Sequence, residues 1–201
     1  MRNIRCALLL LLVIVGSLKS FGQFDRYNGG QLVISEDEMR LYNLIMDYRK
    51  SQNLPAVPLS KKLTFVAQTH AKDSDINGLS NMKGQGCNMH SWSGLGYWES
   101  CCYLNDHSNA KCMWDKPREL TNYDEYGYEI AFFSSDNATP EEALAGWMKS
   151  DGHRNCIINQ SIWKNSNWKA IGVGISGRYA MVWFGKLTDP DGEPKVMCME
   201  K

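Results

Sequence analysis

Apolar residues recur at helical spacing in three stretches of the chain, and each stretch follows a residue that favours the start of a helix. The first follows Ser35, where Glu38 three positions later completes a capping box, and it breaks at Asn53-Leu54-Pro55. The second follows Ser60 and carries alanines that permit close packing before Gly78. The pattern predicts one helix in each stretch.

The third stretch has the clearest start signal. Thr139 can cap a helix, Pro140 suits the first helical position, and Glu142 stands where a capping-box carboxylate belongs. We expect Asp151-Gly152 to end this helix, with Gly152 taking a positive φ. His153 would then leave the end of a well-anchored helix.

A β-hairpin is predicted near the end of the chain. Residues 170–175 and 179–185 are apolar and are separated by the short sequence Ser176-Gly177-Arg178. Gly172 and Gly174 share one strand face, where a helix or a ligand can approach closely. By contrast, residues 81–126 are rich in Gly, Asn, Ser, Cys and aromatic residues without a sustained period, which predicts long loops held by cross-links.

The first 22 residues are typical of a secretory signal. A basic start precedes a short apolar run, Ala7 to Val15, and small residues make cleavage before Gln23 plausible. The alternative is an uncleaved membrane anchor. However, a helix that spans a typical bilayer needs about 20 apolar residues, and the run from Ala7 to Val15 is shorter. We expect an exported protein without a transmembrane segment, located outside the cell or in the periplasm.

Cleavage also changes the charge. It removes Arg2, Arg5 and Lys19 from 22 basic residues and leaves the 22 acidic residues, for a net charge of about −3. No stripe of Lys and Arg occurs in the sequence, so a nucleic acid is not an expected partner. The remaining length, about 179 residues, fits one domain.

Six cysteines remain after cleavage, an even number compatible with three disulfides and an oxidising compartment. Adjacent Cys101 and Cys102 are not expected to bond each other, because neighbouring Cα atoms lie about 3.8 Å apart. Alternatives are that Cys101, Cys102 and Cys112 bind a metal, or that some cysteines are free and buried. The disulfide candidates are Cys87, Cys101, Cys102, Cys112, Cys156 and Cys198.

His90, Glu129 and His153 are the candidates for chemistry. Two imidazoles and one carboxylate can hold Zn²⁺ with an open position for water, or can support acid-base chemistry. Taken singly, each has a plainer interpretation: a hydrogen-bonded loop histidine, a solvated carboxylate at a strand edge, and a histidine that complements the end of a helix. His70 fits a partly buried packing residue, and His107 an exposed loop residue.

Five motifs follow one another along roughly residues 36 to 187. They are Leu63-x-x-x-Ala67-x-x-x-Ala71, Met89-His90-Ser91, Gly127-Tyr128-Glu129-Ile130-Ala131, the run Thr139 to Asn155, and Ile171-Gly172-Val173-Gly174. Individually these motifs are weak, but in this order they are specific. The pattern resembles the CAP superfamily of cysteine-rich secretory, antigen-5 and pathogenesis-related proteins, and its bacterial extracellular branch above all.

The resemblance implies an α+β fold, an α-β-α sandwich with a three- or four-stranded antiparallel sheet between helices. The chain would comprise a signal peptide (1–22), an N-terminal extension (23–34), a CAP-like domain (35–188) with a cysteine-rich insertion at about 87–118, and a tail (189–201).

The resemblance also implies a cleft that holds His90 and His153. Ser91 and Ser150 lie near these histidines in the sequence and are candidate cleft residues as well. In strict register Tyr128 stands where the family has its glutamate, and a one-place shift moves Glu129 to the other strand face. Ser150 stands where many members have a second glutamate. Any divalent metal such as Zn²⁺ would therefore be held weakly, with His90 and His153 as its ligands.

Members of this family have been connected with sterol or fatty-acid binding, channel block, protease activity and defence. We expect a non-catalytic binding module whose cleft of His90, Glu129 and His153 takes a small ligand, a lipid, a divalent metal or a protein. The alternative is a metal-dependent or acid-base hydrolase of the peptidase kind that uses the same three residues. A third interpretation makes the aromatic insertion a contact surface for a partner.

Overall fold

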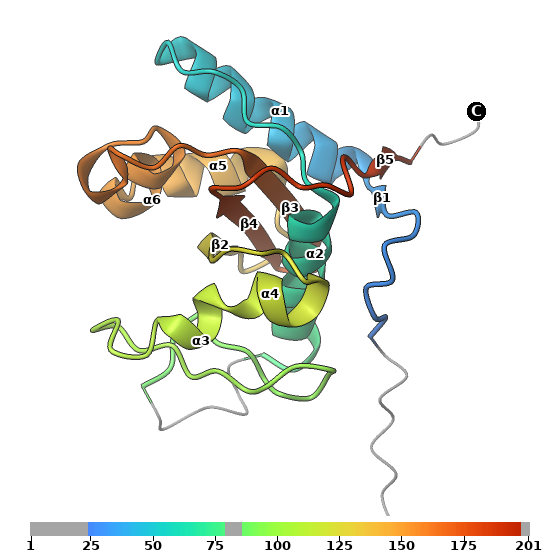
Figure 1. The fold of residues 1–201 in the computed structure, drawn as a ribbon. Coiled ribbons are helices and arrows are strands. Elements are labelled where there is room, and N and C mark those ends of the chain that lie inside the picture. Colours follow the sequence, from blue (N-terminus) through green and yellow to red (C-terminus); the bar gives the residue numbers. More distant parts are fainter. Residues whose placement is uncertain (1–23, 79–85, 198–201) are drawn as a thin grey trace, which may run out of the picture.

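A computed structural model describes residues 24–78 and 86–197 (Figure 1). The predicted signal peptide, its cleavage position before Gln23 and the cysteine at position 198 lie outside the described residues. Within those two ranges, no helix is both long enough and apolar enough to cross a membrane.

The centre of the fold is a three-stranded antiparallel sheet in the order β2-β4-β3. Its strands are β2 (Gly127–Phe133), β3 (Ala170–Ser176) and β4 (Tyr179–Gly185). β3 and β4 form the predicted hairpin, with Ser176 opposite Tyr179 and Gly177 in the turn at a φ of +48°. The hairpin prediction is confirmed, and β2 is left as an edge strand.

Helices cover both faces of this sheet, as expected for an α-β-α sandwich (Figure 1). The helix α2 (Lys61–Ile76) packs on one face, and α1 (Glu36–Ser51) with α5 (Pro140–Met148) packs on the other. Because strand side chains alternate between faces, Ile130 and Val182 join the core on the α1 side, whereas Ala131 and Trp183 join the core around α2. The predicted α+β class is confirmed.

Two glycines let α2 approach the sheet very closely. A Cβ atom added at Gly172 would lie 2.0 Å from the backbone carbon of Leu63, and one at Gly174 would lie 2.3 Å from that of Ala67. Both approaches are far shorter than ordinary van der Waals contact. The predicted role of these glycines is therefore correct, and the neighbour is a helix backbone.

The predicted helix starts are confirmed. Ser35 and Glu38 form a full capping box, while Ser60 and Thr139 each accept a backbone hydrogen bond from the third residue after them. The predicted end of the third helix is wrong. α5 ends at Met148, and a new helix, α6 (Asp151–Ile157), begins where the stop was expected. Gly152 is not among the positive-φ residues, because it lies within the first turn of α6.

The cysteine-rich region is more ordered than long loops. It contains two short helices, α3 (Lys111–Trp114) and α4 (Lys116–Thr121), and two disulfides, Cys87–Cys102 and Cys101–Cys112. Cys101 and Cys102 thus pair with different partners, as predicted. The expectation of three disulfides is not met in the described residues, because Cys156 is a buried free thiol and position 198 lies outside them.

The two ends of the described chain meet. β1 (Val33–Ile34) and β5 (Lys195–Val196) form a small parallel pair, and Tyr27 donates a hydrogen bond to Asp191. The sequence pattern did not predict this pair, since two-residue strands carry too few residues to show a period. The tail is therefore attached to the N-terminal extension by backbone hydrogen bonds.

Candidate functional site

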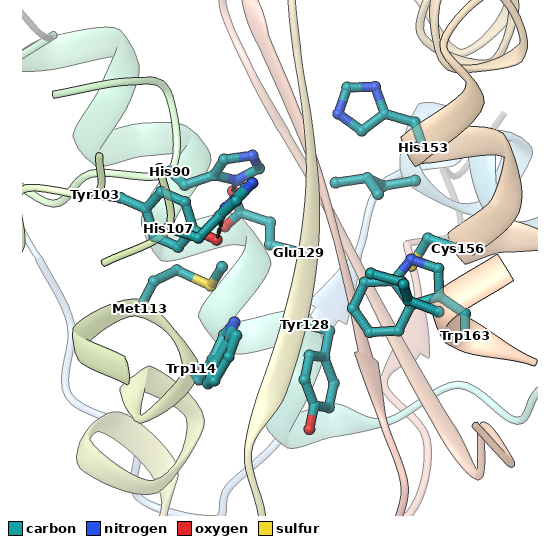
Figure 2. Close-up of a pocket in the computed structure, with 13 residues that line it drawn as sticks. His90, Tyr103, His107, Met113, Trp114, Tyr128, Glu129, His153, Cys156 and Trp163 are labelled. Carbon is teal, nitrogen blue, oxygen red and sulfur yellow. Dashed lines mark hydrogen bonds and ion pairs between the residues drawn. The ribbon is translucent and has the colours of Figure 1, made fainter. Parts of the chain in front are cut away.

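A cavity of about 460 Å³ opens at the edge strand β2, between the cysteine-rich region and α6 (Figure 2). Residues 128–130 of β2 form its floor. One side, here called the insertion wall, consists of His90, Tyr103, His107, Met113 and Trp114. The other side, the helix wall, consists of Gly152, His153, Cys156, Ile162 and Trp163.

The Glu129 carboxylate, which is hydrogen-bonded to His70 and His90, lies at the base of the insertion wall. Glu129 Oε2 accepts from His70 Nδ1 at 2.5 Å, and Glu129 Oε1 accepts from His90 Nδ1 at 2.9 Å. The other ring nitrogen of His70, Nε2, lies 3.0 Å from the backbone oxygen of Ser91. The side chains of His70 and Glu129 are fully buried, whereas 19% of the His90 side chain is exposed.

The alternation of β2 decides which side chain reaches the histidines. Glu129 lies on the same face as Ala131 and points toward α2, where His70 occupies the buried side of the helix. Tyr128 lies on the opposite face and packs against Trp163 and Trp168. The register question raised by the sequence is thereby answered, because Glu129 and not Tyr128 faces His90.

The paired groups shift one another's protonation. Burial favours the neutral acid of Glu129, but the two neighbouring histidines outweigh it and lower its pKa to about 2. Burial alone lowers the pKa of His70, yet attraction to Glu129 and the hydrogen bonds raise it above its ordinary value. A raised histidine pKa and a lowered glutamate pKa are the shifts expected of a buried ion pair between an imidazolium and a carboxylate.

His153 lines the cavity from the opposite wall and has a different environment. Among the described residues, no hydrogen bond or ion pair forms with its ring, which projects from α6 (Figure 2). Burial, followed by the proximity of His90, lowers its pKa. The structure therefore brings His90, Glu129 and His153 to one cavity, although only the first two bond to each other.

The two candidate serines do not line the cavity. Ser91 is buried, and its hydroxyl accepts from the backbone N–H of Tyr103 at 2.9 Å. Ser150 is the residue that precedes α6. His107 is exposed, as expected, and one of its ring nitrogens lies 2.8 Å from the Tyr103 hydroxyl at the rim. Ser91 thus acts on the site only through its backbone oxygen.

Sequence reasoning missed His70 as a site residue. It was expected to be a partly buried packing residue, but its ring is fully buried, bonds to Glu129 and lies parallel to the Trp92 ring with the ring centroids 4.2 Å apart. A basic residue on an apolar helix stripe needs a buried partner, and that rule could have pointed to Glu129. The partner itself is 59 positions away, so spacing alone gave no signal.

Aromatic rings make up much of the rest of the cavity. Tyr128 lies between the two walls, with ring centroids 5.8 Å from Trp114 and 5.2 Å from Trp163. Lys186 lies 4.8 Å from the centroid of the same tyrosine ring. In the aromatic insertion, which is a candidate contact surface, Trp92, Trp98 and Tyr103 are buried, whereas Tyr97 is 39% exposed. Most of these aromatic side chains therefore pack in the core or line the cavity.

The residues present do not fit a zinc site well. Both oxygens of Glu129 are engaged by histidines, so the cavity offers Nε2 of His90 and the ring of His153 as donors. A catalytic zinc site takes three protein ligands and a water. Within the two described ranges, no three His, Cys, Asp or Glu side chains are grouped to hold one ion. The cysteines of the insertion form disulfides, which excludes the thiolate alternative.

Residues 42–183 match the CAP family of cysteine-rich secretory proteins, and this chain belongs to that family. No curated protein matches the sequence.

Similar solved structures include an extracellular SCP-domain protein from Bacillus anthracis (18% identity, TM-score 0.49) and a cysteine-rich secretory protein from Staphylococcus aureus (14%, 0.47). A third is an outer surface protein from Borrelia burgdorferi (18%, 0.45), of which 92% is covered. Each match covers 75% of this chain. The chain spans only 40% and 39% of the first two proteins.

Proposed function

We propose that this CAP-family protein is an exported, non-catalytic binding module that takes a small, mainly apolar ligand into the cavity between the insertion wall and the helix wall. One observation carries the proposal. A single cavity of about 460 Å³ combines an aromatic and aliphatic lining with His90, Glu129 and His153. Small-molecule sites have this size and this composition, in which a few polar groups fix the orientation of the ligand.

Export is supported by two independent features. The first 22 residues have the pattern of a secretory signal, and two disulfides hold the insertion wall. Disulfides persist in oxidising compartments and are rare in the cytosol. Both features favour a location outside the cell or in the periplasm.

Hydrolysis has less support than binding. A general base works best when its pKa lies near the operating pH, but the pKa of Glu129 is about 2 and both of its oxygens already accept hydrogen bonds. Burial raises the pKa of the Cys156 thiol, which disfavours the nucleophilic thiolate. Ser91 is buried and does not line the cavity, and its hydroxyl accepts a hydrogen bond from the backbone N–H of Tyr103.

The experiment is a calorimetric screen of small aromatic and aliphatic compounds against the purified protein and against Trp163→Leu. We expect the variant to bind any ligand at least about tenfold more weakly, a loss of about 1.4 kcal/mol. Leu187→Ala is the matched control, because this leucine is exposed and does not line the cavity. Equal affinity of the wild type and Trp163→Leu for every ligand would contradict binding in this cavity.

A further inference from the structure

We propose that the ligand offers a hydrogen-bond donor, a hydroxyl or an N–H group, to Nε2 of His90, and that the buried pair of His70 and Glu129 makes this nitrogen an acceptor. The inference rests on the proposed function and specifies the chemical class of its ligand. It follows from the hydrogen-bond partners of His70 and His90.

His70 comes first, because both of its ring nitrogens face acceptors. A backbone carbonyl oxygen can only accept, and Nε2 lies 3.0 Å from that of Ser91. An ionised carboxylate also only accepts, and Nδ1 lies 2.5 Å from Glu129. Both nitrogens therefore carry protons, so His70 is an imidazolium. The parallel ring of Trp92 at 4.2 Å offers its π face to this cation.

The neighbouring charges are consistent with that state. Glu129 on β2 is the direct counterion of His70, and Asp73 on α2 adds attraction from the same helix. Lys116 lies over the Trp92 ring, but its ammonium group pairs with Glu119. The imidazolium and the carboxylate neutralise each other, so the cluster does not need a second positive charge on His90.

His90 then has a fixed orientation. Its Nδ1 donates to Glu129 at 2.9 Å, and its ring packs against Tyr103 with centroids 5.2 Å apart. In a neutral imidazole, a proton on Nδ1 leaves a lone pair on Nε2. Among the described residues no group bonds to that nitrogen, and His90 lines the cavity. The polar end of the cavity thus presents an acceptor.

The rest of the cavity indicates what should carry the donor. Trp114, Tyr128 and Trp163 present ring surfaces on both walls and the floor, which favours a flat apolar body. A carboxylate ligand has no proton to donate to His90 and would place its negative charge toward the lone pair on Nε2. The ligand class is therefore a neutral ring compound that bears a hydroxyl or N–H group.

Matched ring compounds test this class. Indole and benzofuran have nearly the same shape, but only indole has a donor; phenol and anisole form a second such pair, and benzoate supplies the anion. By calorimetry at neutral pH, we expect indole and phenol to bind at least about tenfold more tightly than their partners and than benzoate, because without the donor the His90 acceptor loses its water and gains no hydrogen bond. The proposal is overturned if benzofuran, anisole or benzoate binds as tightly as the donors, or if none of the five binds. Absence of binding by every compound in the broader screen would instead remove the proposed function.

Variants and spectroscopy locate the effect. His90→Phe should bring the indole-to-benzofuran affinity ratio close to one, whereas Leu187→Phe, at an exposed residue outside the cavity lining, should keep it. Nitrogen NMR of the histidine rings should show both nitrogens of His70 protonated and Nε2 of His90 unprotonated. A proton on Nε2 of His90, or a neutral His70, would contradict the proposal even if the variants lose affinity through misfolding.

Discussion

The two walls of the cavity are built differently. The insertion wall is fixed by two disulfides and by the bonds of His90 to Glu129 and of Glu129 to His70. The helix wall depends on the packing of α6 and the following 3₁₀ helix, η3 (Ser161–Trp163), and its histidine has no side-chain partner among the described residues. The insertion wall is therefore preorganised to orient a ligand, whereas the helix wall is better able to adapt to the size of the ligand.

Positive φ values occur in both walls, 53° at Asn159 and Ser161 near the start of η3 and 60° at His107, so backbone strain does not distinguish them. Cross-links do, because both disulfides of the described residues lie in the cysteine-rich region that forms the insertion wall. In the helix wall, Ile162 is 82% exposed although it lines the cavity. Conformational change on ligand binding is therefore expected in the helix wall before the insertion wall.

The largest expected effect comes from breaking the histidine–carboxylate cluster. Glu129→Gln should lower the free energy of unfolding by about 3–5 kcal/mol, because it leaves the His70 imidazolium buried without its counterion. His153→Gln, in the helix wall, should change it by less than about 1 kcal/mol, since no ion pair is lost. Urea unfolding of both variants measures the difference. Similar losses in the two variants would mean that the walls are not held differently.

An intermediate effect is expected from the disulfides. The double substitution Cys87→Ser and Cys102→Ser opens a loop of 15 residues and should cost about 3 kcal/mol. Hydrogen exchange should then speed up in residues 86–114 and stay unchanged in α6 and η3. Cys156→Ala is the control, because it removes a thiol of the helix wall and no disulfide. Faster exchange in α6 or η3 of the double variant would show that the walls are coupled.

The smallest effect concerns metal binding across the two walls. His90 and His153 supply only two imidazoles, so we expect weak Zn²⁺ affinity that is higher at about pH 7.5 than at about pH 5.5, because a protonated imidazole cannot bind the ion. Burial and His90 lower the pKa of His153, so this ring is already neutral at a lower pH than an ordinary histidine. Calorimetry at the two pH values measures the change. An affinity that does not depend on pH would argue against ligation by histidine.

Local signals in the sequence predicted much of the fold. The residues that start α1, α2 and α5 are capping residues, and the hairpin is marked by apolar runs around Gly177. The end of α5 was misplaced because Asp151-Gly152 suits the first turn of a new helix as well as the end of an old one. Such an ambiguity is settled by packing, since Cys156 and Ile157 of α6 enter the core.

The candidate site was only partly accessible from the sequence. His90, Glu129 and His153 were identified by motif order, and the structure places them around one cavity. His70 was not, because its role depends on a carboxylate brought by a distant strand and on the depth at which α2 packs. Ser91 and Ser150 were chosen as sequence neighbours of histidines, and adjacency along a chain does not fix where a side chain points.

The close contact between α2 and the sheet makes the chemistry of the cavity sensitive to positions that never touch a ligand. His70 follows Ala67 by one helical turn, and Ala67 rests against the backbone at Gly174. A single methyl group at that glycine would push the helix outward and lengthen the bond between His70 and Glu129. Relatives that depend on the hydrogen bond between His70 and Glu129 should therefore keep a glycine at this position, even where the residues that line their cavity differ.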